Sequence, residues 1–474
     1  MNGGLAAGWP FARRELVAVL LGFLVTLPFV TTRIYASDEV QYFAWLRSAA
    51  FDRDVDFENE YQYFHDAGVA RGTGFHETFL VKRNEAGHRE NYGPIGSAVL
   101  WAPFYAMGHM VAILTGAPAN GFSQPYISAV SLGSAIYGCL AVLLSAAIAR
   151  RVVGPGLAAS LLVCFATPLV FYIYIAPPMS HANSAFAVAL FLWVWLRIRQ
   201  RWTLAGMVCL GVTGALMTMV RDQDVFFAAG PALDFLRQWG RAAKTTRVAA
   251  ARSWGVAAGT GVVAFAVAYT PQLLASTALH GHVGPSQVVA RKMSWTSPHA
   301  LEVLFSPSHG FFAWTPLALL AVVGLALLAA GRVSGSTRSS EPDARWIGTL
   351  ALVMMGLQAY VSGAVESWTV AGSFGQRRFV GLTPLLTLGI ASLMGAVASL
   401  RSRTATAAVV VAFTICLWWN AGLMVQFGTN TMDRQRLTLR ENAWSTFVVL
   451  PREVPTLVWR YLTDRASFYN QPRR

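Results

Sequence analysis

The chain has 474 residues, of which 55% are hydrophobic and only 13% are charged. A soluble protein of this length carries about 25% charged residues, so the composition excludes an ordinary soluble protein and indicates a polytopic helical membrane protein. The net charge of +14 is not gathered on one face, as a nucleic-acid-binding protein requires. It stands in short clusters between apolar runs, a pattern that reports membrane topology.

Runs of about twenty apolar residues predict an all-α transmembrane bundle of about eleven spans. In chain order we expect spans near 15–33, 126–149, 155–175, 183–197, 203–220, a short sixth span containing Asp234, 254–275, an eighth ending before Arg332, 347–363, 379–399 and 405–426. The pair Arg13-Arg14 places the N-terminus in the cytoplasm, and the absence of a cleavage site before the first acids predicts an uncleaved first helix.

Five basic loops fall on one side of the membrane under this count, which the positive-inside rule assigns to the cytoplasm. They contain Arg150-Arg151, Arg197 to Arg201, Arg237 to Arg252, Arg332 with Arg338, and Arg401 with Arg403. The apolar run 93–115 is ambiguous, because a span there would move the later basic loops to the outside. We therefore expect 93–115 to lie in the outer interface as a juxtamembrane or re-entrant element.

This count divides the chain into one transmembrane domain, residues 1–426, and an extracytoplasmic polar tail, residues 427–474. Within the domain, 34–125 forms a large first extracytoplasmic loop with juxtamembrane helices. The four cysteines lie inside apolar runs without disulfide or metal spacing, so we expect small buried side chains. They are Cys139, Cys164, Cys209 and Cys416.

The first loop opens with two adjacent carboxylates, Asp38 and Glu39, directly after the first predicted helix. Such a pair at a membrane surface can accept a proton, hold a metal or bind a polar headgroup. It can equally be a helix cap in a solvated loop. Adjacent residues at a helix start point about 100° apart, so the sequence does not decide which acid would face a cavity.

Further acids follow at 52–60, and their Asp-x-Asp spacing is a weak pattern for a shared divalent ion such as Mg or Mn. The alternative is that these side chains only support the loop. The supporting set that we expect is Asp54, Asp56, Glu60 and Tyr92.

Basic side chains next to the predicted outer helix ends have no topological purpose there, so they suggest an anionic ligand such as phosphate. The candidates are Arg89, Arg221, Arg291, Lys292, Arg377 and Arg378. Asp222 and His181 accompany them, and His181 is either a ligand contact or proton carrier, or a polar residue that begins a helix. The competing explanation is a set of structural ion pairs, for example Arg221 with Asp224.

An ordered series of short segments resembles the GT-C superfamily of polytopic glycosyltransferases over roughly 15–425. The likeness is greatest to the bacterial branch with the Rhizobium lipopolysaccharide glycosyltransferases, and more distant to the aminoarabinose transferase and protein O-mannosyltransferases. The segments are Ser37-Asp38-Glu39, Asp54 to Tyr61, Asn91 to Gly96, Trp101-Ala-Pro103, Pro178 to His181, Val220 to Gln223, Phe305 to Gly310 and Gly375 to Phe379.

The resemblance implies an enzyme of a bacterial cytoplasmic membrane that takes a sugar from a polyprenyl-phosphate donor, with inversion, to an extracytoplasmic glycan, lipid or protein. It assigns the general base to Asp38, with Glu39 as the substitute, and phosphate binding to basic residues. The family's Lys before Pro-Pro is missing at Tyr92-Gly93-Pro94, so the phosphate falls to Arg377, Arg378 or Arg221, with Arg89 the nearest cation. Two alternatives stay open: a transporter or flippase of lipid-linked saccharides, and a non-catalytic scaffold.

Overall fold

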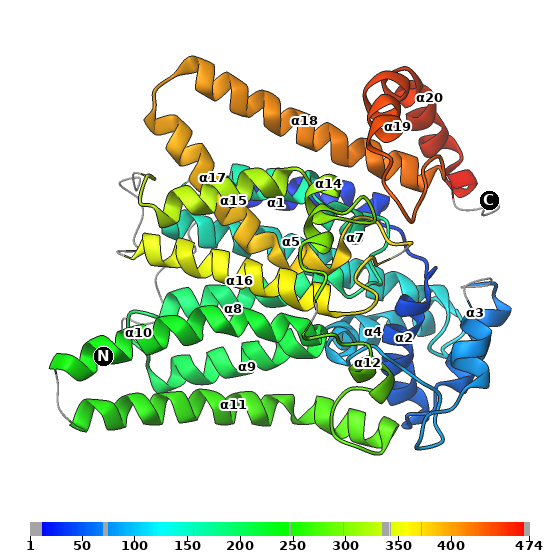
Figure 1. The fold of residues 1–474 in the computed structure, drawn as a ribbon. Helices are drawn as coiled ribbons and strands as arrows, with labels where there is room; N and C mark the ends of the chain where they lie inside the picture. Colours follow the sequence, from blue (N-terminus) through cyan, green and yellow to red (C-terminus); the bar gives the residue numbers. More distant parts are fainter. Residues whose placement is uncertain are drawn as a thin grey trace.

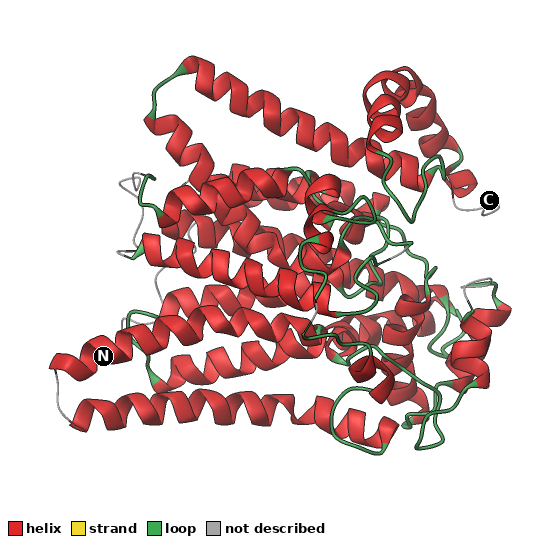
Figure 2. Ribbon diagram, in the orientation of Figure 1, coloured by secondary structure: helices red, strands yellow, loops and turns green. Residues whose placement is uncertain are grey.

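The computed structural model describes residues 12–69, 74–154, 156–245, 248–296, 298–333, 341, 343–370 and 372–468. Among these residues every regular element is helical (Figure 2), and Met293 and Val365 form an isolated β-bridge. The predicted all-α class is therefore confirmed. Arg338, which we expected in a basic loop, lies outside the described residues.

In chain order the helices are described in four sets, and Figure 1 labels most of them. The N-terminal group is α1 (Arg13–Thr26), α2 (Ser37–Arg47), α3 (Glu58–Asp66) and α4 (Gly96–Thr115). The bundle consists of α5 (Gln124–Val152), α6 (Leu157–Phe165), α7 (Leu169–Tyr174), α8 (His181–Ile198), α9 (Leu204–Val220), α10 (Ala229–Thr245), α11 (Val248–His280), α15 (Leu317–Ala329), α16 (Ala344–Ala364), α17 (Thr383–Ser399) and α18 (Arg403–Gly428). The short helices are α12 (Gln287–Arg291), α13 (Glu302–Phe305) and α14 (Phe311–Trp314), and the tail adds α19 (Leu439–Trp444) and α20 (Leu450–Thr463).

Short 3₁₀ or π-helical turns join several of these helices. They are η1 (Leu27–Phe29), η2 (Ser48–Asp52), η3 (His76–Val81), η4 (Asp222–Ala228), η5 (Arg377–Leu382), η6 (Ser445–Val449) and η7 (Arg465–Phe468).

Seven described helices are long and apolar enough to cross a membrane, and α9 and α15 are apolar but shorter. The seven are Gly96–Thr115, Gln124–Val152, His181–Ile198, Arg252–His280, Ala344–Ala364, Arg377–Ser399 and Arg403–Gly428. On α11 the side chains of Val262, Val263 and Val267 are all exposed, as suits a helix that faces lipid. These apolar helices are compatible with integration into a membrane, and the total of eleven spans stays an expectation.

The predicted span 155–175 is broken into α6 and α7 at Pro168. Proline has no N–H to donate, so the helix cannot continue through it without losing a hydrogen bond. The side-chain amide of Asn420, on α18, donates to the carbonyl oxygens of Phe165 and Thr167 at 2.8 and 3.0 Å. Those contacts satisfy carbonyls that the end of α6 leaves free.

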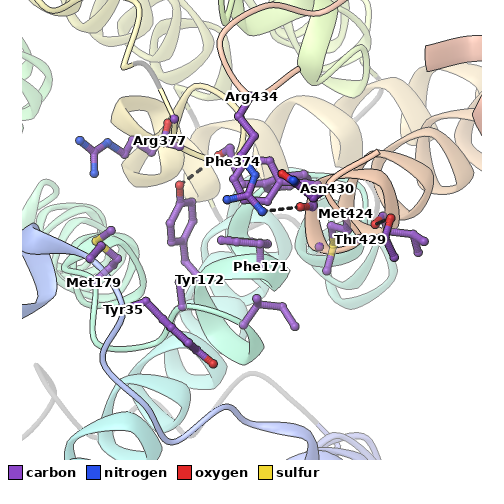
Figure 3. Close-up of a pocket in the computed structure, with 18 of the residues that line it drawn as sticks. Tyr35, Phe171, Tyr172, Met179, Phe374, Arg377, Met424, Thr429, Asn430 and Arg434 are labelled. Carbon is purple, nitrogen blue, oxygen red and sulfur yellow. Dashed lines mark hydrogen bonds between the residues drawn. The ribbon is translucent and has the colours of Figure 1, made fainter. Parts of the chain in front are cut away.

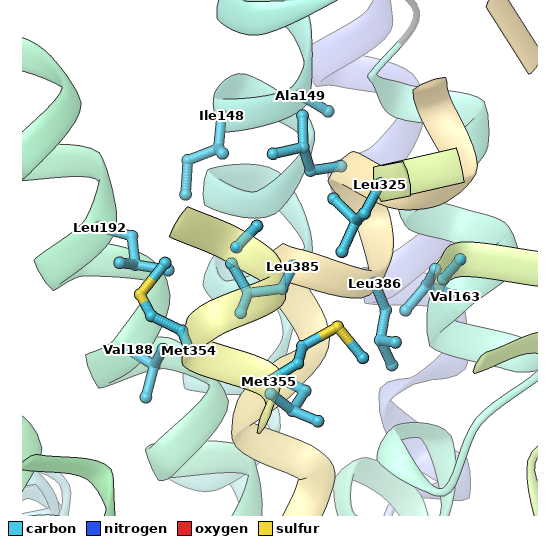
Figure 4. Packing of buried hydrophobic residues seen from close by; sticks show 14 of the residues in the cluster. Ile148, Ala149, Val163, Val188, Leu192, Leu325, Met354, Met355, Leu385 and Leu386 are labelled. Carbon is cyan, nitrogen blue, oxygen red and sulfur yellow. The ribbon is translucent and has the colours of Figure 1, made fainter. Parts of the chain in front are cut away.

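The core of the bundle is assembled from helices that are far apart in the chain (Figure 4). Buried side chains of α5, α6, α8, α15, α16 and α17 meet there. The backbones of α15 and α17 touch at glycines, since a Cβ at Gly324 would lie 1.8 Å from the carbonyl oxygen of Gly389. Cys139, Cys164 and Cys416 are buried as expected, whereas Cys209 is exposed. The expectation was wrong for Cys209 alone. This residue lies on a face of α9 that also exposes Val208 and Val212, so not every apolar residue of α9 belongs to the core.

The predicted basic loops meet at one end of the bundle, which we call the basic end. Arg151 and Arg199 both bind Glu341, at 2.7 and 2.8 Å. Arg199 also binds Asp234 at 2.8 Å. The side chains of Arg199, Asp234 and Glu341 are all nearly inaccessible to solvent. A buried charge is tolerated when it is paired and hydrogen-bonded, which explains an acid inside α10.

The opposite end, the loop-rich end, carries the first loop and the tail (Figure 1). Helix α4 contacts two neighbours there and also packs further along α5, where its Trp101 donates to Ser134. A Cβ at Gly96 would lie 2.3 Å from the backbone of Met219, at the end of α9. A Cβ at Gly108 would lie 3.0 Å from Pro125, at the start of α5. Helix α4 has the length and composition of a span, yet both contacts are with the loop-rich ends of its neighbours.

Candidate functional site

Helix α2 presents its two acids in different directions. The Glu39 carboxylate folds back and accepts hydrogen bonds from the backbone N–H groups of Tyr35 and Ala36, at 2.6 and 3.1 Å. Glu39 is 1% exposed, and burial raises its pKa to about 7. Asp38 points to Arg377, with 2.5 Å between its Oδ2 and the guanidinium Nη1, and 35% of its side chain is exposed. Glu39 therefore caps the helix, while Asp38 is available to a ligand.

Five of the residues proposed from the sequence come together around Asp38, and we call them the charged cluster: Asp38, His181, Arg221, Arg377 and Arg378. The guanidinium of Arg221 contacts Nδ1 of His181. The neighbouring Gln223 donates to the backbone oxygen of Arg378 at 2.8 Å and accepts from Arg221 at 3.5 Å. Arg377 and Arg378 lie near the carboxylate of Asp38, whereas Arg221 also lies near the acids Asp222 and Asp224. Guanidinium groups gathered around an accessible carboxylate are chemically suited to an anion.

Two tyrosines that the sequence analysis missed complete the cluster. Tyr42 lies one helical turn after Asp38, and its hydroxyl accepts a hydrogen bond from Ser180 at 3.1 Å. The hydroxyl of Tyr172 donates to the carbonyl oxygen of Phe374 at 3.0 Å, and its ring packs edge-on against His181. The i, i+4 spacing from Asp38 was a signal for Tyr42. Tyr172 offered no such signal, because it comes from another helix.

A cavity of about 1110 Å³ opens beside the charged cluster. Its polar lining residues include Asp38, together with Tyr35, Arg377 and Arg434 of the tail (Figure 3). Arg434 donates to the carbonyl oxygen of Phe427 at 2.8 Å. The remaining walls are mostly apolar. Their residues include Phe29, Ile175, Met179, Met424, Val425 and Phe427.

The tail forms one of these walls, although its composition predicted only a polar extension. Side chains of α20 that line the cavity are spaced one helical turn apart. They are Val454, Leu457, Val458, Tyr461 and Leu462. The positions i, i+3, i+4, i+7 and i+8 define one face of a helix, so this periodicity was a signal for an amphipathic helix.

His309 ties the segment before Arg377 to the rest of the site. Its imidazole Nε2 lies 3.0 Å from the carbonyl oxygen of Ser373, and its own carbonyl accepts from Gln376 at 3.3 Å. The ring stacks on Trp314 with centroids 4.8 Å apart. Burial lowers the pKa of His309, which keeps the ring neutral and fit for this hydrogen bond. These contacts fix the loop from which Arg377 extends.

Several predicted residues make their contacts away from the charged cluster. Arg89 is buried and pairs with Glu58 at 3.0 Å, while Arg291 is exposed and donates to Gln287 at 3.2 Å. Lys292 is also exposed, and its backbone donates to the carbonyl oxygen of Val289 and accepts from the N–H of Glu366. Asp222 adjoins Arg221 and is exposed. The expected pair of Arg221 with Asp224 gives way to a hydrogen bond from Ser184 to the Asp224 carboxylate at 2.6 Å.

The acids at 52–60 make their contacts with other residues of the first loop. Asp52 and Glu60 pair with Arg47, and Asp54 accepts a hydrogen bond from Ser48 at 2.8 Å. Asp56 donates its N–H to Asp54, and Tyr92 donates its N–H to Gln41. Over the described residues no group of three or more His, Cys, Asp or Glu side chains could hold a metal ion. The contacts of these acids are thus made within the first loop, and their supporting role stays a prediction.

No protein-family model matches this chain, and no curated protein matches it significantly. The function therefore has to be argued from the site itself. An accessible carboxylate beside several guanidinium groups, on the wall of an amphipathic cavity, suits proton removal from one reactant and anion binding on the other.

Proposed function

We propose that this protein is an integral membrane glycosyltransferase. It moves a sugar from a polyprenyl-phosphate donor to an extracytoplasmic acceptor, which is an envelope glycan, a lipid or a protein. The observation that supports this most is the contact of Asp38 with Arg377 on the wall of the cavity, with Arg221, Arg378 and His181 around it. Residues that the GT-C resemblance assigns to the base and to the phosphate thus lie together.

The proposed reaction is an inverting displacement at the anomeric carbon. The acceptor oxygen forms the new bond to that carbon, its proton passes to the Asp38 carboxylate, and the bond to the phosphate oxygen breaks. The electron pair leaves with the phosphate, whose charge Arg377, Arg378 and Arg221 stabilise. A phosphate leaving group needs cations rather than a strong general acid. In this scheme Glu39 holds the start of α2, and it replaces Asp38 only if the cap is released.

The site lies at the loop-rich end, which we assign to the extracytoplasmic face of a bacterial inner membrane. The clustering of Arg151, Arg199 and Arg237 at the other end supports a cytoplasmic basic end under the positive-inside rule. The N-terminus is then cytoplasmic and the tail extracytoplasmic. We assign helix α4 to the outer interface, because a span there would move the later basic loops to the outside.

A transporter or flippase of lipid-linked saccharides is the second candidate. Its substrate path would call for ionisable groups in the middle of the spans. The helical segments 124–149, 204–220, 253–279, 346–364, 383–399 and 404–428 contain no Asp, Glu, Lys or Arg. The charged groups collect at the two ends instead, which favours an enzyme over a transporter. A non-catalytic scaffold would retain the cavity and lack turnover.

The deciding experiment uses membranes containing the full chain and a panel of polyprenyl-phosphate sugars. We expect one donor to be consumed with stoichiometric release of polyprenyl phosphate, and no release by the Asp38→Asn variant. A flippase would instead move a fluorescent lipid-linked saccharide between leaflets without cleaving it. If no donor of the panel is cleaved although extracts of the native envelope supply the acceptor, the enzymatic proposal is wrong.

A further inference from the structure

The apolar walls of the cavity are not filled by the protein's own side chains. Phe29 is 40% exposed, Val458 52% and Leu462 64%, and all three line the cavity. An apolar ligand that covers these side chains gains about 25 cal/mol of binding free energy for each Å² of apolar surface removed from water. At about 1110 Å³ the cavity exceeds the ~300–1,000 Å³ of common ligand pockets. It therefore has room for more than a sugar phosphate.

The tail helix α20 presents two different faces. Val454, Leu457, Val458, Tyr461 and Leu462 line the cavity. The other face carries Arg452, Thr456 and Arg460, which are absent from the lining. An amphipathic helix whose apolar face remains accessible is suited to an apolar partner at a membrane surface.

The tail is fastened across the cavity to the end of the first helix. Arg465 donates hydrogen bonds to the carbonyl oxygens of Pro28 and Phe29, at 2.8 and 2.7 Å. The ring of Tyr461 stacks on that of Phe29 with centroids 6.2 Å apart. Arg465 also lies over the Tyr461 ring, at 5.1 Å. These contacts hold α20 beside the cavity, opposite Met424 and Val425 of α18.

The polar and apolar walls stand in one continuous space. Arg377 and Arg434 line this cavity (Figure 3). The apolar residues of α20 line the same cavity. A molecule that satisfies both walls has an anionic head and a hydrocarbon chain. The donor proposed above is such a molecule, because its phosphate carries a single isoprenoid chain.

We propose that α20 and the end of α18 form a binding site for the isoprenoid chain of the donor, so that the units next to the phosphate lie on the protein rather than in the bilayer. This inference deepens the proposed function and rests on it for the identity of the headgroup. It makes Leu457, Val458 and Leu462 specificity-determining residues for the lipid. The tail thereby becomes part of the binding site.

Photoaffinity labelling of the full chain in membranes tests the site without any sugar. The probe is a short isoprenoid phosphate with a diazirine on its chain, and the expected adducts lie within 424–462. Val458→Trp places an indole ring in the cavity and should reduce labelling about tenfold. This factor corresponds to about 1.4 kcal/mol of binding free energy, which lies within the energetic cost of overpacking a site. Thr456→Trp adds the same side chain to the opposite face of α20 and should leave labelling unchanged. Leu462→Glu, which places a charge on the same wall, serves if Val458→Trp does not fold.

Two results would overturn the inference: adducts that map away from α18 and α20, or equal labelling of the Val458→Trp and Thr456→Trp variants. An excess of unlabelled isoprenoid phosphate should compete, whereas phosphatidylglycerol at the same concentration should not. Equal competition by the phospholipid would show a general lipid surface and refute the single-chain site. The two proposals can fail separately. Labelling of α18 and α20 without any sugar transfer would support the lipid site and refute the enzyme. Transfer with a KM for the donor that Val458→Trp leaves unchanged would support the enzyme and refute the lipid site.

Discussion

Replacing Asp38 by Asn should separate catalysis from donor binding. The two side chains have nearly the same shape, so insertion and packing should persist, but the amide cannot accept the acceptor's proton. Loss of a general base lowers the rate by about 10²–10⁴-fold. In the structure Asp38 also forms an ion pair with Arg377, with 2.5 Å between Oδ2 and Nη1. The Asp38→Asn variant therefore releases that guanidinium for the donor phosphate.

The size of this second effect follows from the exposure of the pair. The side chains of Asp38 and Arg377 are 35% and 24% exposed, so water screens their attraction, and we take about 1 kcal/mol, the upper end for accessible ion pairs. That energy corresponds to about fivefold tighter binding of the donor. We expect kcat to fall by about 10²–10⁴-fold, while the Kd for the donor falls about fivefold.

The assay combines steady-state transfer with direct binding of a polyprenyl phosphate in detergent. Glu39→Gln is the matched control, because it removes the adjacent carboxylate and leaves the contact with Arg377 in place. Transfer by the Asp38→Asn variant at the wild-type rate would refute the base assignment. Weaker donor binding with a parallel drop in melting temperature would show that Asp38 is structural.

Three further predictions concern the anion site, a buried acid and the topology. Arg377→Gln or Arg378→Gln should raise the KM for the donor by about 10- to 100-fold, the equivalent of about 1.5–3 kcal/mol for a charge-assisted contact, whereas Arg291→Gln, outside the charged cluster, should not; equal effects at all three positions would contradict the assignment. The pKa of Glu39 is raised to about 7 by burial, so its protonated form stabilises the fold below about pH 4.5 and this contribution, about 3 kcal/mol, is lost as the pH rises through 7. Melting curves should show Glu39→Gln gaining on wild type between pH 4.5 and 7, and parallel curves would disprove the buried titration. In a cysteine-free background, engineered cysteines at 34–93, 285–300 and in the tail should react with an impermeant reagent outside the cell, and those at 238–252 and 333–345 should not; labelling of 238–252 in intact cells would reverse the proposed orientation.

Local patterns in the sequence determined the helices and the grouping of the basic loops. Apolar runs and arginine clusters act over one span at a time, so their positions along the chain suffice. The predicted 183–197 and 347–363 thus correspond to α8 and α16, within a few residues. The break at Pro168 was missed, although proline gave a local signal. The amphipathic spacing in α20 was also present in the sequence and was overlooked in favour of the tail's polar composition.

Only the tertiary structure decided which charged residues form a site. Asp38 meets Arg377 across 339 residues of chain, and a charge carries no local mark of its distant partner. Arg89 was an equal candidate by sequence, but it is neutralised by Glu58. The choice between Asp38 and Glu39 was likewise beyond the sequence. It depends on the rotation of α2 about its axis, which is set by packing of that helix against the first-loop core, and this packing turns one carboxylate into a helix cap and the other toward the cavity.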